Sequence, residues 1–237
     1  MALFGSLFTR SLEQQRLKAL AKAPAGPVHD YLSTPLPASE TPVDELPLLA
    51  IDLETSGLDP TTDRLLSIGF VPVEHGEVRL GGARHILVRQ ALDEHGRSES
   101  VGESATIHGL TDDALIAGVP LAEALALTLA ALRGRALLAH FTSVEVGFLT
   151  AACEQVFGAR PVFCDVDTMH IQYRLLTTGF DDEPPRSALR LWGARARYGL
   201  PVYKAHEALT DALACAELYL ALVAEPGAGA TLADLRR

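Results

Sequence analysis

The chain has 237 residues, of which 48% are hydrophobic and 21% charged, so it can bury a core of its own without disulfides. Its formal net charge of −10 argues against a protein that grips long duplex DNA through Lys and Arg, and favours short or single-stranded substrates or a partner that supplies the grip. The sequence contains no run of about 18 apolar residues, so it predicts no membrane span. The first residues lack the pattern of a secretory signal, and we therefore expect a cytoplasmic protein.

Residues 1–45 predict an N-terminal helical and Pro-rich arm. The segment from Ser11 to Lys22 has helical composition, and prolines are frequent from Pro24 to Pro42. Prolines at this density favour an extended linker. The arm could be a plain spacer, or it could dock on the domain or on a partner such as a polymerase.

Residues 46–224 predict the main domain, which opens with three strands. The strands begin near Leu46, Arg64 and Glu77, with a hairpin turn at His75-Gly76 and a break or bulge at Gly81-Gly82. Short connections make these three strands antiparallel.

Helices and two further strands follow. Thr111 is expected to cap a helix, and Pro120 to open another. Two short apolar segments, 135–140 and 162–166, are the expected fourth and fifth strands, and both should be parallel because they arrive through helical crossovers. The remaining helices are expected at 143–157, 167–176, 190–198 and 206–223, and residues 225–237 are expected to form a frayed tail. The fold class is therefore α/β, with a mixed five-stranded sheet flanked by helices.

The strongest chemical signal is the segment Asp52-Leu53-Glu54. Residues two apart in a strand point to the same face, so two carboxylates meet at the end of an apolar strand. Such a pair is poorly tolerated unless a cation lies between the carboxylates, and oxygen ligands suit Mg²⁺ or Mn²⁺. A strand end that surfaces into solvent is the plainer interpretation of this short pattern.

The residues that follow favour the metal interpretation. The segment AIDLETSGLDP, with Thr55, Ser56 and Leu58 after the acids, resembles the first motif of the DEDDh (DnaQ-like) 3′–5′ exonucleases, a family that includes the epsilon proofreading subunit of bacterial DNA polymerase III. The resemblance implies an RNase H-like fold and two divalent cations, Mg²⁺ or Mn²⁺. It implies that Asp52 and Glu54 are metal ligands.

Two further motifs of the family have counterparts. The segment from Leu138 to Leu149 resembles the second motif, with Phe141 in place of the usual Asn, Val144 in place of Phe and Glu145 in place of Asp. Glutamate keeps the carboxylate but changes its reach. The segment from Tyr203 to Ala212 resembles the third motif and assigns Asp211 as a ligand and His206 as the general base. We expect His206 on a turn just before the last helix. The catalytic set is therefore Asp52, Glu54, Glu145, His206 and Asp211, and all but His206 are expected to bind metal.

The resemblance also assigns a substrate-binding set. The segment from Thr106 to Thr111 is similar to the family's segment beside the terminal nucleotide, although it also suits a loop that prepares the helix capped by Thr111. The implied substrate-binding residues are Leu53, Thr55, Ser56, Leu58, Ile107 and His108. Asp167 is interpreted as a helix N-cap. Arg190, Arg195 and Arg197 are interpreted mainly as a solvated basic helix face.

Together these motifs predict a nuclease that releases nucleoside 5′-monophosphates from the 3′ end of single-stranded or short DNA or RNA. An oligoribonuclease-like enzyme for RNA or dinucleotides, and a non-catalytic nucleic-acid-binding module on the same fold, are the alternatives. A role in proofreading or DNA repair, a polymerase or other protein as partner, and a monomeric or homodimeric state all remain open.

Overall fold

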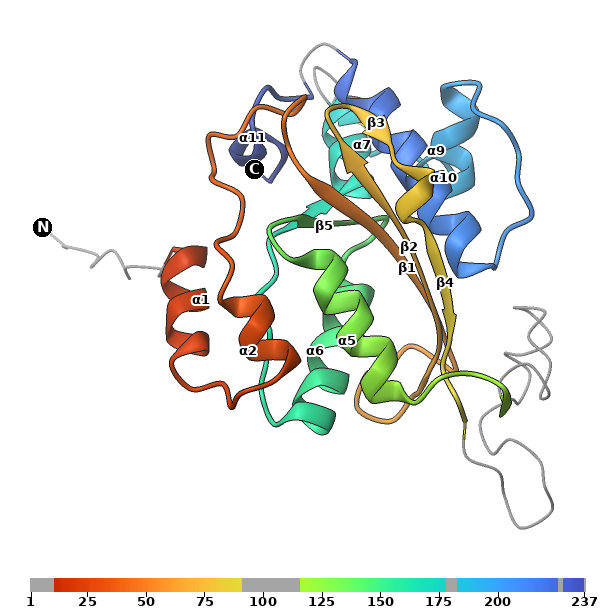
Figure 1. Ribbon diagram of the computed structural model, residues 1–237. Helices are drawn as coiled ribbons and strands as arrows, with labels where there is room; N and C mark the ends of the chain where they lie inside the picture. Colours follow the sequence, from red (N-terminus) through yellow and green to blue (C-terminus); the bar gives the residue numbers. More distant parts are fainter. Residues whose placement is uncertain (1–10, 91–115, 178–182, 226–227, 237) are drawn as a thin grey trace, which may run out of the picture.

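The computed structural model describes residues 11–90, 116–177, 183–225 and 228–236, and Figure 1 shows how their helices and strands are arranged. A mixed sheet runs through the centre in the order β3-β2-β1-β5-β6, and β4 also pairs with β2. The strands are β1 (Leu48–Thr55), β2 (Leu65–Glu74), β3 (Glu77–Val78), β4 (Arg84–Leu87), β5 (Ala136–Ala139) and β6 (Asp165–Asp167).

The strand directions confirm the predicted mixed sheet. Strand β2 is antiparallel to β1, whereas β5 is parallel to β1 and β6 is parallel to β5. The predicted hairpin turn is present, because His75 and Gly76 have φ angles of 53° and 69°. The third predicted strand is split into β3 and β4 by a short 3₁₀ helix, η1 (Leu80–Gly82), at the predicted glycine break. Strand β6 begins three residues later than predicted.

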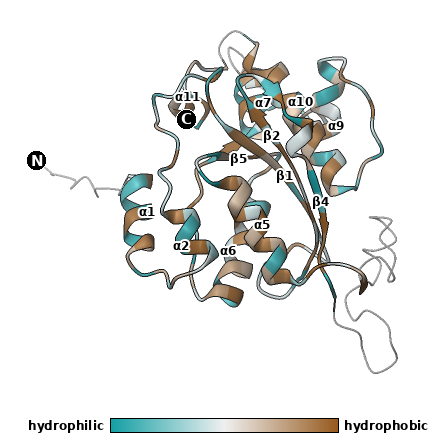
Figure 2. Ribbon diagram, viewed as in Figure 1, coloured by the Kyte–Doolittle hydropathy of each residue, from teal (hydrophilic) through white to brown (hydrophobic). Residues whose placement is uncertain are grey.

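Helices cover both faces of the sheet (Figure 1). One face packs against α2 (Pro27–Leu32), α5 (Leu121–Leu132) and α6 (Ser143–Phe157), with α1 (Leu12–Leu20) beside them. The other face carries α7 (Thr168–Thr177), α9 (Leu191–Arg197) and α10 (Ala208–Val223), and α8 (Arg186–Leu189) precedes α9. Strands β1 and β2 are mostly hydrophobic along their length in Figure 2, which is typical of strands buried on both faces.

The Pro-rich segment is not an extended linker over its whole length. Pro27 opens α2, a position where its missing N–H costs nothing, and Val28, Tyr31 and Leu32 are buried in the core. The Tyr31 hydroxyl donates to the Val162 carbonyl at 3.1 Å. Residues of the predicted arm therefore pack on the domain, because apolar side chains between the prolines gain burial that outweighs the local preference for extended backbone.

The predicted fraying of the C-terminal tail is also wrong for its described part. Thr231 caps the short helix α11 (Leu232–Leu235), and Leu232 and Leu235 are buried. The Val43 amide donates to the Ala230 carbonyl at 3.1 Å, so the segment just before β1 lies beside the segment that leads to α11. The predicted limits at residues 45 and 224 remain a prediction, although segments outside them contribute to the core.

Within the described ranges, no helix is long and apolar enough to span a membrane. The predicted helix cap at Thr111 lies outside the described residues.

Candidate active site

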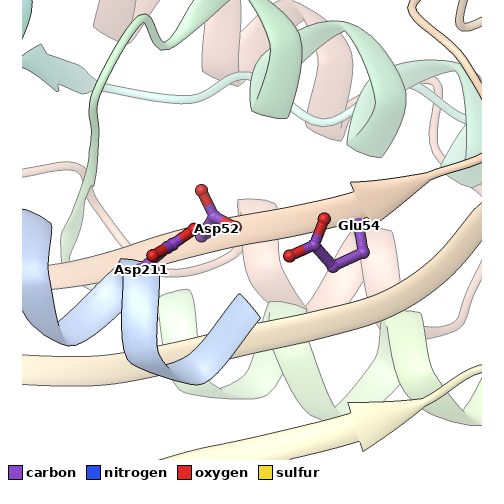
Figure 3. A group of neighbouring side chains, drawn as sticks. All are labelled: Asp52, Glu54 and Asp211. Carbon is purple, nitrogen blue, oxygen red and sulfur yellow. The ribbon is translucent and has the colours of Figure 1, made fainter. Parts of the chain in front are cut away.

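Three acidic side chains meet where β1 and α10 touch. Asp52 and Glu54 extend from the same face of β1, and Asp211 comes from the first turn of α10 (Figure 3). Each offers a carboxylate oxygen, and these oxygens all lie within 4.8 Å of one another. Asp52 and Glu54 are two residues apart on the strand, and this spacing brings their carboxylates to one place, as predicted. Asp211, from the segment that resembles the third motif, is the third acid of the cluster.

Gly69 makes this approach possible, although sequence reasoning did not single it out. It pairs with Asp52 across β1 and β2. A Cβ atom added at Gly69 would lie 2.1 Å from the backbone carbon of Ala208 and 2.1 Å from the amide nitrogen of Leu209. Only glycine lets the first turn of α10 rest directly on the sheet, and that turn carries Asp211. An isolated glycine inside a strand pattern is the signal that could have indicated this close approach.

The three carboxylates are crowded and poorly hydrated. Burial raises the pKa of Asp52 well above its usual range, and the neighbouring Glu145, Asp211 and Glu54 raise it further. Burial, with Asp211 and Glu207 nearby, raises the pKa of Glu54 to about 7. Burial also raises the pKa of Asp211, although the backbone hydrogen bond from His206 opposes that shift. Acids in this state favour either protonation or a bound cation.

Glu145 lies beside this cluster but is not part of it. It is in the first turn of α6, only 5% exposed, and is the carboxylate that most raises the pKa of Asp52. Burial raises the pKa of Glu145 itself to about 8. The close group found in the described part of the chain contains Asp52, Glu54 and Asp211 without Glu145. The fourth acid is therefore adjacent to the three and as buried as Glu54.

The described residues fit a bound cation. Asp211 Oδ1 and Glu145 Oε2 are both buried without a hydrogen-bond partner among those residues. A buried carboxylate oxygen with no donor is costly unless something else neutralises it. Hard, anionic oxygen ligands are the type that Mg²⁺ and Mn²⁺ prefer.

A neighbouring carboxylate holds the turn that leads to Glu145. Asp167 accepts hydrogen bonds from the backbone amides of Phe141 at 2.9 Å and Thr142 at 3.1 Å. It also accepts one from Met169 at 2.9 Å at the start of α7, so its predicted N-cap role is confirmed. Phe141 adopts a left-handed φ of 78°, which Asn tolerates better than Phe. The Asp167 contacts thus fix the backbone at the position where the family usually has Asn.

His206 lies on a turn before α10, as predicted. Its side chain is exposed, its φ is 69°, and its backbone amide donates to Asp211 Oδ2 at 3.0 Å. The same turn therefore fixes the orientation of Asp211 and carries the imidazole. The position of His206 is a structural finding, while its role as general base is part of the proposal below.

The predicted substrate-binding residues divide into several kinds. Leu58 is 83% exposed at the end of the loop after β1. Thr55 and Ser56 shape that loop, because the Thr55 hydroxyl donates to the Gly57 carbonyl at 2.6 Å and the Ser56 hydroxyl to Asp63 at 3.2 Å. Leu53 is only 7% exposed and packs in the core on the opposite face from the acids. Its side chain therefore points away from the acid cluster, and the assignment of Leu53 to substrate binding remains a prediction. Ile107 and His108 lie outside the described residues.

Arg195 is not part of a solvated basic face. It is 1% exposed and donates to the carbonyls of Ala214 at 2.6 Å and Pro201 at 2.8 Å. It also forms an ion pair with Glu217 at 2.8 Å. These contacts tie α9 to α10 and to the segment that leads to His206. Sequence reasoning missed this because periodicity does not reveal which arginine is buried by a neighbouring helix.

Comparisons with known proteins agree with this geometry. The RNase T exonuclease family model matches residues 49–219. The PolC-type DNA polymerase III of Thermotoga petrophila is 26% identical over 178 residues, which are 74% of this chain and 12% of that protein. The DNA polymerase III subunit epsilon of Treponema pallidum is 26% identical over 175 residues, which are 74% of this chain and 75% of that protein.

Solved structures show the same fold at low sequence identity. Exonuclease I of E. coli in complex with a dT13 oligonucleotide has a TM-score of 0.61 and 17% identity, covering 75% of this chain and 41% of that chain. The cell-death related nuclease 4 has a TM-score of 0.63 and 12% identity, covering 76% of this chain and 64% of that chain. The family match spans well over half of the sequence and includes the three clustered acids. The chain therefore belongs to the exonuclease family.

Proposed function

We propose that this protein is a metal-dependent 3′–5′ exonuclease that releases nucleoside 5′-monophosphates from single-stranded or short nucleic acid. The carrying observation is the cluster of Asp52, Glu54 and Asp211, whose carboxylate oxygens lie within 4.8 Å of one another in a member of the exonuclease family. Two comparisons support nucleic acid as the substrate class: one relative is a subunit of a DNA polymerase, and the structural neighbour exonuclease I was solved with a dT13 oligonucleotide.

Asp52, Glu54, Glu145 and Asp211 are the residues that would hold two divalent cations, Mg²⁺ or Mn²⁺. When bound, such ions lower the pKa of the attacking water and offset negative charge on the phosphate and the leaving oxygen. Glu145 lies apart from the three clustered acids. Its side chain is one methylene longer than that of the usual Asp, so its carboxylate could extend further toward a cation held by those acids.

His206 is proposed as the general base. It would take the proton from the water whose oxygen attacks phosphorus, while the bond from phosphorus to the 3′ oxygen of the preceding nucleotide breaks. An imidazole suits this role because its ordinary pKa lies near working pH. His206 is exposed on a turn whose backbone is fixed by Asp211, and this position suits contact with a substrate at the acid cluster.

Substrate positioning is assigned to the loop after β1, through Thr55, Ser56 and Leu58, with Ile107 and His108 as further candidates. The loop is held by its own hydrogen bonds, so Leu58 is presented to solvent on a fixed support. A polymerase or other protein remains a candidate partner for residues 1–45.

The test is a Mn²⁺-dependent digestion panel. It would compare 5′-labelled single-stranded DNA, duplex DNA with a mismatched 3′ end, RNA and dinucleotides, each with wild type and with Asp52→Asn. We expect stepwise release of nucleoside 5′-monophosphates from at least one substrate, abolished by EDTA and by the substitution. If no 3′ end is shortened, the non-catalytic binding module becomes the better description. Faster cleavage of dinucleotides than of longer strands would identify the oligoribonuclease-like activity instead.

A further inference from the structure

One surface groove of the described residues lies away from the acid cluster. It has a volume of about 790 Å³ and runs between α1 and the segment that follows α6. Figure 1 shows α1 at the outer edge of the molecule, beside α2. None of the described residues proposed as metal ligands or substrate contacts lines this groove, so the groove requires a separate explanation.

Positive charge gathers along the groove although the chain is acidic overall. Lys18 is in the last turn of α1, Lys22 lies just beyond the end of that helix, and Arg160 lies on the other side of the groove. Both lysines are exposed, and neither forms a hydrogen bond or ion pair with another described residue. Arg160 is paired with Glu154 at 2.6 Å. Two of the chain's 20 Lys and Arg residues thus stand without partners among the described residues at one groove of a protein with a net charge of −10.

The remaining lining is aliphatic and small. Ala19, Ala23, Ala159 and Val162 are partly buried and pack against the main core, so they form a fixed apolar floor. A fixed floor with cations beside it suits a ligand that has both apolar side chains and negative charge.

We propose that this groove binds a short acidic segment with aliphatic side chains from a partner protein. The lysines would face carboxylates, and the alanine and valine floor would receive the aliphatic groups. A nucleic-acid strand fits less well, because no aromatic side chain is among the described residues that line the groove, and single-strand grooves use such rings to stack bases. The proposal does not rest on the nuclease activity.

Fluorescence anisotropy with the full chain in metal-free buffer tests this directly. The probe is a fluorescein-labelled DLDDLL peptide, compared with a DSDDSS peptide of equal charge and with a labelled twelve-nucleotide oligothymidylate. We expect saturable binding of DLDDLL with Kd below about 1 mM, and at least about tenfold weaker binding of DSDDSS. The variant Asp52→Asn should bind DLDDLL like wild type, which separates this proposal from the nuclease assignment.

Charge reversal provides the matched controls. Lys18→Glu with Lys22→Glu should weaken DLDDLL binding at least about tenfold. Arg79→Glu with Arg84→Glu, on exposed residues near β3 and β4, changes net charge equally and should change binding less than about twofold. Lys18→Gln with Lys22→Gln gives a milder second variant, and thermal melts confirm that each variant is folded.

Several results would overturn the proposal. The first two are equal binding of DLDDLL and DSDDSS, and no saturable binding of either peptide. The third is that the Arg79 and Arg84 variant loses as much DLDDLL binding as the Lys18 and Lys22 variant does. The fourth is that the oligothymidylate binds in place of the peptide and depends on the two lysines. The last result would identify the groove as a nucleic-acid track.

Discussion

Asp52, Glu54 and Asp211 meet where a strand and a helix touch directly, whereas Glu145 reaches the same region from a turn held by another carboxylate. In the first region the close packing at Gly69 sets the distances between acids. In the second, Asp167 fixes the backbone of Phe141 and Thr142 before α6 begins. The first region keeps the family's acids, and the second departs from the family at Phe141, Val144 and Glu145. Close packing thus holds the three clustered acids in place, while hydrogen bonds to Asp167 hold the turn that leads to Glu145.

The largest expected effect comes from the first region. Asp52→Asn should lower kcat/KM at least about 1,000-fold, because it removes charge that the proposed cations require, equivalent to about 4 kcal/mol of transition-state stabilisation. The metal-free variant should melt at a higher temperature than wild type, because one of the crowded carboxylates is neutralised. Asp44→Asn, at an exposed position outside the site, is the control. Undiminished digestion by purified Asp52→Asn would remove Asp52 from the mechanism.

Gly69→Ala tests the packing that joins β2 to α10. The new methyl group would meet the backbone of Ala208 and Leu209, so the first turn of α10 must move. Overpacking of this kind costs about 1–3 kcal/mol of stability, and a displacement of Asp211 by about 1 Å could lower activity about 100-fold. Chemical denaturation and digestion rates measure the two effects.

Gly81→Ala is the matched control, since a Cβ atom there would meet nothing within 4 Å. It should leave activity unchanged. Equal behaviour of the two variants would show that α10 does not depend on Gly69 for its position.

The contrast between the two regions also explains how much the sequence predicts. The pairing of Asp52 with Glu54 follows from the alternation of side chains in a strand, and the order of strands and crossovers predicts the mixed sheet. An isolated glycine in a strand can indicate a close approach at Gly69, but neither for Gly69 nor for Arg195 does the sequence indicate which helix packs against it in three dimensions.

The ends of the chain show the same limit. The proline pattern predicts extended backbone for 24–42, and the glycine-rich tail predicts fraying, yet Tyr31, Leu32, Leu232 and Leu235 are buried. Local propensity is overridden there by tertiary burial, which no local pattern encodes.

The pH dependence of stability joins both regions, because each contains a buried carboxyl with a raised pKa. The usual pKa of Glu is near 4.5, and burial raises that of Glu54 to about 7 and that of Glu145 to about 8. Between about pH 4.5 and 8 the folded state therefore binds more protons than the unfolded state. Stability of the metal-free protein should fall as pH rises through this window.

Denaturation in EDTA across that range measures this effect. Saturating Mn²⁺ should reduce or reverse the slope, because bound cations stabilise the ionised acids and bind only the folded state. A metal-free protein that gains stability from pH 5 to 8 would contradict the proposed state of these two residues.

Phe141→Asn carries the smallest expected effect and addresses the second region alone. A left-handed φ costs Phe more than Asn, so the substitution should raise the free energy of unfolding by about 1 kcal/mol. The Phe141 side chain is 49% exposed, so little buried area is lost in exchange. Mn²⁺ affinity should be unchanged, because the Asp167 carboxylate still accepts from the backbone amides that precede Glu145. His75→Asn, at φ 53° in the β2–β3 hairpin, should give a smaller gain far from the acids, because His tolerates a left-handed φ better than Phe does. If Phe141→Asn instead destabilises the protein while His75→Asn stabilises it, the Phe141 ring contributes packing that exceeds its backbone strain, and the second region depends on side-chain packing as the first does.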